Sequence, residues 1–306
     1  MKRALAVVAL LGVAACAPPI INTKIEDSAR RSVPVAICLK PLARRGNPGV
    51  APVLAPQDYW SMILPSFDPA AGTVDLSAPD CSGRNIFASP ELLQSDSPRI
   101  GAVRAKPEDV ITGQGPDGFR VLWLRTHTFT DGSAAGPIAL VRPRDAYAEV
   151  YAIGLYRGSR GKSRFALERL GFDLAVSSVD DGCADVKGQK SCETVMTAYL
   201  LAGGQLVPAA RIPIDRLEYK PAAGASGMAQ FRLTATPLFQ DRSIRVLEQL
   251  AVTDPNQGVL RKSELERLFT LRGRAKLVPN VDSLWNEAMG GAPGAKEGAP
   301  PGTPKK

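Results

Sequence analysis

The densest cluster of cations in the chain lies between two segments that are expected to be strands. Within eight residues the sequence places four basic side chains, at Arg157, Arg160, Lys162 and Arg164. Guanidinium and ammonium groups this close together suit phosphate or uronate ligands, because they form charge-assisted hydrogen bonds with anions. Exposed charge is also the usual state of a turn. A solvated hairpin tip is therefore the favoured interpretation of the cluster, and an anion-binding site is the alternative.

Two sequence motifs match known active-site patterns but lie in the wrong context. Residues 113–118 (GQGPDG) fit GxGxxG, yet a strand is expected after them, whereas a dinucleotide fingerprint opens a helix. Ser159 and Lys162 have the SxxK spacing of penicillin-binding enzymes, yet the partner motifs of that chemistry are missing from the sequence. We expect turns at both places and no cofactor.

The single histidine, His127, would have to serve any Ser-His-Asp relay. On a strand it shares a face with Trp123 and Phe129, as a packed or rim residue would. A zinc site of the usual kind would need further ligands of the same type. We therefore expect no metal and no catalytic residue here.

Acidic side chains offer two other kinds of chemistry. Asp180, Asp181, Asp185 and Glu193 flank the segment from Cys183 to Cys192 and carry oxygen ligands for calcium, but they lack the alternating order of a DxDxDG loop. An acidic surface turn is the favoured interpretation. Glycoside hydrolysis needs two carboxyl groups at separations of roughly 5 or roughly 9 Å, which a sequence alone does not place.

The N-terminus combines a charged start with a short apolar run. Lys2 and Arg3 precede residues 4–12 (ALAVVALLG), a run far shorter than the roughly 20 residues of a membrane-spanning helix. This order is typical of a targeting segment. Residues 13–16 (VAAC), which follow it, resemble the lipobox of bacterial lipoprotein precursors.

The resemblance implies that Cys16 is the lipid attachment site and the first mature residue. Signal peptidase II would cut before Cys16, and the sulfur would carry a diacylglyceryl group. Two or three acyl chains anchor a protein stably, since each buried methylene contributes about 0.8 kcal/mol. Ala17 stands where an Asp would resemble an inner-membrane retention signal, so we expect the outer membrane. Cleavage as an ordinary secretory peptide is the alternative, and it also exports the body.

Cys38, Cys81, Cys183 and Cys192 remain once Cys16 carries lipid, and an even number suits a compartment that permits disulfides. Three pairings are open. We favour Cys183 with Cys192, because the segment between them (ADVKGQKS) predicts a polar loop joining two strands, and Cys38 with Cys81 then follows by elimination. A four-thiolate metal site is disfavoured because the sequence has no CxxC pair.

Short strand patterns at intervals of about ten residues predict an all-β fold, a mainly antiparallel meander in a sandwich or barrel. A short turn or helix is expected near residues 57–64. Residues 263–270 fit either a helix with a capping box or a strand. The expected strands cover residues 33–39, 73–76, 119–130, 137–142, 147–156, 164–170, 172–179, 194–201, 205–212, 229–238 and 244–253, with a last hairpin about Gly273.

Alternation along three of these strands predicts which side chains share a face. In residues 147–156, large side chains lie on one face and small ones on the other. Residues 172–179 and 244–253 alternate apolar with polar side chains and are expected to be half-buried. The large set in the first strand is Tyr147, Tyr151, Ile153 and Leu155.

The chain divides into four expected parts. Residues 1–15 form a signal peptide, 16–32 a tether, 33–285 one β-rich domain with a loop-rich candidate subdomain at 33–115, and 286–306 a disordered Gly/Pro/Ala tail. The formal charge is +8, and removing the signal and the tail leaves +5 on the body. This mild excess, without a dense basic run, suits an anionic polysaccharide and excludes nucleic acid as the expected partner.

The function expected from these observations is non-catalytic binding or assembly in the cell envelope. Membrane contact would come through the N-terminal lipid, and the partner would be an envelope protein or an anionic polysaccharide. The alternative is a periplasmic or surface glycan hydrolase that uses paired carboxylates.

Overall fold

The computed structural model describes residues 34–42, 54–90, 92, 101–159, 162–171, 173–186 and 189–290, without the side chains of 184–190. The expected signal peptide and tether therefore lie outside the described residues, as does the chain after Gly290. The described residues fall in one compact unit. Within the described part, no helix is both long and apolar enough to cross a membrane.

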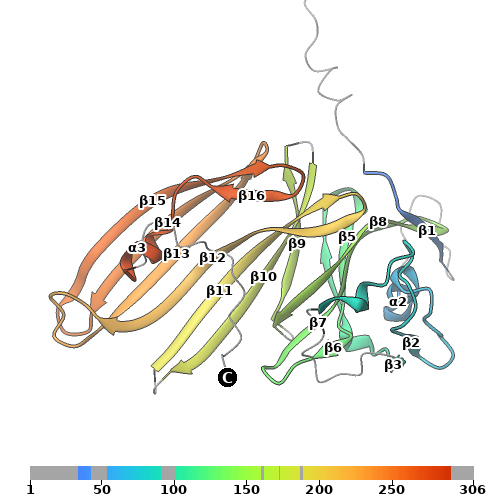
Figure 1. Ribbon diagram of the computed structural model, residues 1–306, viewed down its shortest axis with the longest axis horizontal. Helices are drawn as coiled ribbons and strands as arrows, with labels where there is room; N and C mark the ends of the chain where they lie inside the picture. Colours follow the sequence, from blue (N-terminus) through green and yellow to red (C-terminus); the bar gives the residue numbers. More distant parts are fainter. Residues whose placement is uncertain are drawn as a thin grey trace, which may run out of the picture. The chain divides into compact units, whose positions relative to one another are not determined.

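Short elements dominate the N-terminal part of the body. Helix α2 begins at a proline, and the Asp58 carboxylate accepts a hydrogen bond from the Ala55 amide at 2.7 Å, which satisfies a free donor at the helix start. Figure 1 shows α2 beside β1 and β8. The elements are β1 (Cys38–Pro41), α2 (Pro56–Ile63), β2 (Thr73–Asp75), η1 (Ile86–Ala88), β3 (Ala102–Arg104), η3 (Pro107–Asp109), β4 (Val110–Gln114) and η4 (Pro116–Gly118).

From residue 120 onward the described chain is almost entirely strand. Fourteen strands of the described residues join one sheet, and every pairing in it is antiparallel except a single parallel bridge between β8 and β12. The all-β, mainly antiparallel prediction is confirmed. The strands are β5 (Arg120–Leu124), β6 (His127–Thr128), β7 (Ser133–Pro143), β8 (Tyr147–Ser159), β9 (Arg164–Leu170), β10 (Asp173–Val186), β11 (Gln189–Ala202), β12 (Gln205–Pro221), β13 (Met228–Gln240), β14 (Ser243–Asp254), β15 (Gly258–Arg272) and β16 (Lys276–Pro279), followed by helix α3 (Leu284–Ala288).

The sheet branches at β12. One path runs from β12 through β8, β7 and β5 to β4, and a second runs from β12 through β11 and β10 to β9. The other edge of β12 continues through β13, β14 and β15 to β16. Figure 1 shows the long strands of the second and third paths lying next to one another in chain order. Because β12 belongs to all three paths, it is the strand through which the parts of the fold are joined.

The branches pack face to face around separate clusters of buried side chains. One face of β5, β7 and β8 packs on α2, and the opposite face packs on β9, β10 and β11. Strands β9–β12 pack their other face against β14, β15 and β16. Strand β10 lies between two layers, so both of its faces are buried. Leu174 and Val176 belong to one cluster and Ala175 belongs to the next. The prediction that this strand is half-buried is therefore wrong.

A β-bulge in β8 overturns the predicted grouping of its large side chains. The pairing of β7 with β8 shifts between Leu140 and Val141, so that the bulge falls at Tyr151. An extra residue reverses the inward and outward alternation beyond it. Tyr151 consequently packs with the β9–β11 layer, whereas Ile153 packs on the α2 side.

Several expected element boundaries also change. β1 begins at Cys38, residues 34–37 lie in no strand, and β4 forms where a loop was expected. The strand expected at 119–130 is split into β5 and β6. Residues 263–270 form part of β15, because their backbone groups pair with β14 on one edge and with β16 on the other, and this excludes the helix.

Both expected disulfides are present, Cys38–Cys81 and Cys183–Cys192. The reason for the second bridge differs from the one predicted. β10 continues to Val186 and β11 begins at Gln189, so Cys183 and Cys192 are directly opposite in the ladder of a long hairpin and are not joined by a loop. Disulfides agree with a non-cytoplasmic location.

The C-terminal boundary lies later than expected. Residues 286–290, assigned to the tail, belong to the body: α3 packs Leu284 and Trp285 against Phe231, Leu233 and Leu250. Ala288 and Met289 join the same cluster, and Glu287 pairs with Arg261 at 3.2 Å. The hairpin about Gly273 is confirmed as the β15–β16 turn.

Candidate functional site

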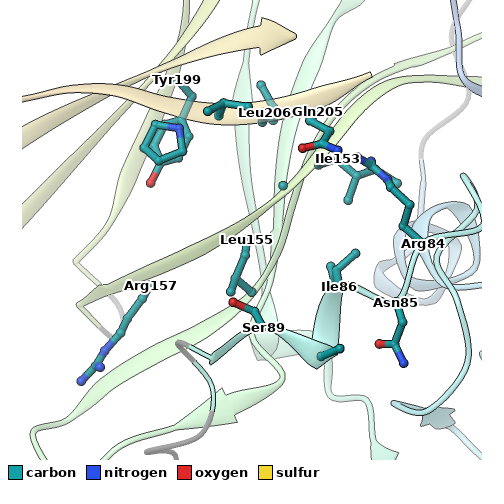
Figure 2. Close-up of a pocket in the computed structure, with 14 residues that line it drawn as sticks. Arg84, Asn85, Ile86, Ser89, Ile153, Leu155, Arg157, Tyr199, Gln205 and Leu206 are labelled. Atoms are coloured by element: carbon teal, nitrogen blue, oxygen red, sulfur yellow. Dashed lines mark hydrogen bonds between the residues drawn. The ribbon is translucent and has the colours of Figure 1, made fainter. Parts of the chain in front are cut away.

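A pocket of 610 Å³ lies where the β11–β12 turn meets β8 and the loop that precedes η1. Its volume is in the range of small-molecule sites. Figure 2 shows Arg84 and Arg157 on opposite sides of it, Leu155 between them and Tyr199 and Leu206 on the β12 side. The pocket therefore has a mixed lining of cations, amides and apolar side chains.

The floor of the pocket is built by close backbone approach between β8 and β12. The Ile153 amide donates to the Gly204 carbonyl at 3.2 Å, and Gln205 pairs with Ile153 in the parallel bridge. A Cβ on Gly154 would lie 2.2 Å from the Leu206 carbonyl oxygen, so only glycine fits there. These contacts place the exposed Gln205 at the rim of the pocket.

Arg84 joins the loop to that floor. Its Nη2 donates to the carbonyls of Ile153 at 3.3 Å and Gly204 at 3.1 Å, and its Nε donates to the Ser82 hydroxyl at 2.8 Å. The buried Asp80 carboxylate accepts bonds from the Ser82 hydroxyl at 2.6 Å and the Arg84 amide at 3.1 Å. Arg84 is thus held in place before any ligand binds, which lowers the entropic cost of binding.

Arg157 supplies the second cation. Its guanidinium lies 2.8 Å from the Asp131 carboxylate and 3.7 Å over the Phe129 ring. A hydrogen bond from the Ser133 hydroxyl and the charge of Arg157 help hold the pKa of Asp131 below its usual value. About a third of the Arg157 side chain stays exposed, at 35%, so donors remain available to a ligand.

The chemistry of the lining favours binding. Among the fourteen residues that line the pocket are two arginines, an asparagine, a serine, a tyrosine and a glutamine, and none is Asp or Glu. Guanidinium and amide groups donate hydrogen bonds to carboxylates and hydroxyls, while apolar side chains contact the carbon faces of a ligand. Acid–base hydrolysis through paired carboxylates needs acids that this lining does not supply.

The basic cluster considered for anion binding is only partly assembled at this pocket. Arg157 lies in the lining, whereas Arg164 lies 3.5 Å from Asp181 and is mostly exposed. Lys162 is exposed, and Arg160 lies outside the described residues. The flanking strands do not form a hairpin, because β8 pairs with β7 and β9 pairs with β10. Ser159, the serine of the SxxK match, donates to the Asp181 carbonyl at 2.9 Å.

The acidic residues considered for calcium have other partners. Asp180 accepts bonds from the Tyr156 hydroxyl, the Ser163 hydroxyl at 2.6 Å and the Ser159 amide at 3.2 Å. Glu193 lies 3.6 Å from Arg211, and the Asp185 side chain is outside the described set. No group of three His, Cys, Asp or Glu side chains in the described part of the chain is arranged to hold a metal ion.

Of the packed and rim positions expected for His127, the structure shows the packed one. It is 1% exposed, its Nδ1 lies 2.8 Å from the Thr126 hydroxyl, and its ring lies 5.8 Å from that of Phe87. Burial lowers the pKa of this histidine. Trp123 belongs to the opposite cluster, because the strand is interrupted between the two residues.

The GxGxxG match spans the end of β4 and the β4–β5 turn, and two of its three glycines have a packing role. A Cβ on Gly113 would lie 2.4 Å from the Phe165 carbonyl oxygen, and one on Gly115 would lie 2.7 Å from Leu167. Glycine at these positions lets β4 approach β9 closely.

Sequence reasoning missed a buried ion pair, Glu248 with Arg267, in which both side chains are fully buried. Arg267 Nη1 lies 2.6 Å from Glu248 Oε1, and the same carboxylate accepts bonds from the Ser283 hydroxyl and the Leu284 amide. The alternation of Val246 and Leu250 with exposed neighbours was a signal that position 248 points inward. The pair connects β14 and β15 to the start of α3.

Comparison with known proteins gave no match to any protein-family model, curated protein or solved structure.

Proposed function

We propose that this protein is a lipid-anchored envelope lipoprotein that binds an anionic polysaccharide without catalysis. The observation that carries the proposal is the pocket at the β8–β12 bridge, with its preformed Arg84, its cation at Arg157 and its lining free of carboxylates. The lipobox-like residues before Cys16 and the two disulfides support export and anchoring.

Sugar acids fit this lining better than neutral sugars do. A uronate carboxylate accepts hydrogen bonds from guanidinium groups, and ring hydroxyls bond to amides such as that of Gln205. Leu155 and Ile86 offer apolar contact to the carbon–hydrogen faces of the ring. An open pocket of this kind suits a segment of a long chain.

Binding is tested with tetragalacturonate and, as a neutral probe, maltotetraose, by isothermal titration. We expect the acidic probe to bind more tightly, and Arg157→Gln or Gln205→Ala to weaken it about tenfold, since each removes an interaction of about 1.4 kcal/mol. Arg245→Gln is the matched control, because Arg245 is 39% exposed and paired with Glu266 but lies on β14, away from the pocket. Equal binding of both probes, or release of new reducing ends, would contradict the proposal.

Anchoring is tested separately at Cys16. We expect Cys16→Ala to move the protein from the membrane fraction to the soluble fraction and to abolish incorporation of labelled palmitate, because both follow from the acylated cysteine. Ala17→Asp keeps the cysteine and tests sorting to the outer membrane. Unchanged membrane association of an unlabelled Cys16→Ala protein would argue against the lipid anchor.

A further inference from the structure

Exposed apolar side chains gather on β1 and on the end of β8 that pairs with it. Leu39 is 61% exposed and Tyr147 is 40% exposed, and Pro41 is also exposed. In the ladder, Leu39 lies opposite Glu149 and Pro41 lies opposite Tyr147. Because opposite residues of an antiparallel pair project from one face, Leu39, Pro41 and Tyr147 share a surface.

The border of this surface is polar, and the acid that lies opposite Leu39, Glu149, is paired. The Glu149 carboxylate accepts bonds from Arg144 Nε at 2.9 Å and from the Tyr151 hydroxyl at 2.7 Å. Arg142 lies 5.1 Å over the Phe119 ring. Aliphatic side chains with tyrosine and arginine around them are the composition found where proteins meet the headgroup level of a membrane.

The position of this surface in the chain indicates what covers it. Pro34 is the first described residue, and seventeen residues separate it from Cys16. A chain of that length spans at most roughly 60 Å. If Cys16 carries lipid, Pro34 is always within that distance of a bilayer, and β1 is the first described strand after it.

We propose that Leu39, Pro41 and Tyr147 form a docking surface that rests on the phospholipid headgroup region. The inference builds on the proposed lipid anchor. Three side chains are far fewer than the 20–30 residues a side of a stable protein–protein interface. A weak contact suffices for a surface that the anchor keeps at high effective concentration near the bilayer. Docking by this edge would fix how the body is oriented on the membrane.

The test holds the protein on a bilayer without relying on acylation. The mature chain with Cys16→Ala and an N-terminal hexahistidine tag is bound to phosphatidylethanolamine/phosphatidylglycerol vesicles containing a nickel-chelating lipid, and in parallel to nickel–agarose. The rates of backbone hydrogen–deuterium exchange are then compared between the vesicle-bound and the agarose-bound protein. On vesicles we expect exchange to slow by about threefold or more at residues 34–42 and 146–151.

Leu39→Asp and Tyr147→Ser should remove this protection. Val259→Asp should keep it, because Val259 is 67% exposed but lies on the β14–β15 hairpin. Equal exchange on vesicles and agarose, or protection that survives both surface variants, would overturn the docking surface. Palmitate labelling at Cys16 does not depend on the exchange experiment. A failure of the proposed lipid anchor is therefore distinguished from a failure of the proposed docking surface.

Discussion

At the scale of single residues, the buried pair of Glu248 and Arg267 takes two charges out of water. Glu248→Gln should reduce the free energy of unfolding by about 3–5 kcal/mol, because it leaves the guanidinium buried without its carboxylate. Urea denaturation measures the loss. The double variant Glu248→Leu with Arg267→Met removes both charges and should cost less than Glu248→Gln alone. If the stability losses of the single variants Glu248→Leu and Arg267→Met add up to the loss of the double variant, the two side chains do not act as a pair.

The sequence did not reveal which cations come together in the pocket. Arg157, Arg160, Lys162 and Arg164 are close in sequence, and this closeness predicted one cluster. In space, Arg157 turns to Asp131 and Arg164 to Asp181, because the strands on either side of them belong to different branches of the sheet. Arg84, more than seventy positions earlier, is the cation that shares the pocket with Arg157. Such partners are set by tertiary contacts that no local spacing encodes.

At the scale of elements, period-two alternation predicted most strands and missed how they pair. Residues 164–170 match β9 at both ends, and residues 244–253 differ from β14 by one residue at each end. Strand length was underestimated for β10, β11 and β12, whose ends are polar because they extend beyond the buried layers. The bulge at Tyr151 has no signature in alternation, since both flanking stretches look regular.

Helix α3 shows how a composition argument placed a boundary too early. Removing residues 287–306 should lower the melting temperature by roughly 2–8 °C, because it takes away the packing of Ala288 and Met289 and the Glu287–Arg261 pair, about 1–2 kcal/mol in total. Differential scanning fluorimetry measures the change. Removing only residues 291–306 keeps the α3 contacts within the described part of the chain and is the control. Equal melting temperatures for the two truncations would show that α3 adds nothing to stability.

At the scale of the whole molecule, several parts of the fold contain groups whose protons bind differently in the folded and unfolded chain. Burial lowers the pKa of His127, so between that value and the unfolded value of 6.5 the unfolded chain binds the extra proton. Stability therefore falls as pH drops below about 6.5, by at most about 1.4 kcal/mol per pH unit from this one group. Burial and the charge of Asp180 raise the pKa of Tyr156 above its usual value of 10.0. The folded chain then keeps a proton that the unfolded chain loses, so stability also falls as pH rises above about 10.

These two groups should give the protein a stability plateau at neutral to mildly alkaline pH, with a decline on each side. Urea unfolding between pH 5 and 11 measures the profile. Two carboxylates with lowered pKa values, Asp131 and Glu149, do not set the decline between pH 5 and 6.5, because they lose their contribution only near and below the unfolded values of 3.8 and 4.5. His127→Gln should flatten the acid slope, and Tyr156→Phe should flatten the alkaline slope, whatever each substitution does to stability at pH 8. An acid slope that persists in His127→Gln would mean that another part of the fold takes up protons there, and the assignment to the single histidine would be wrong.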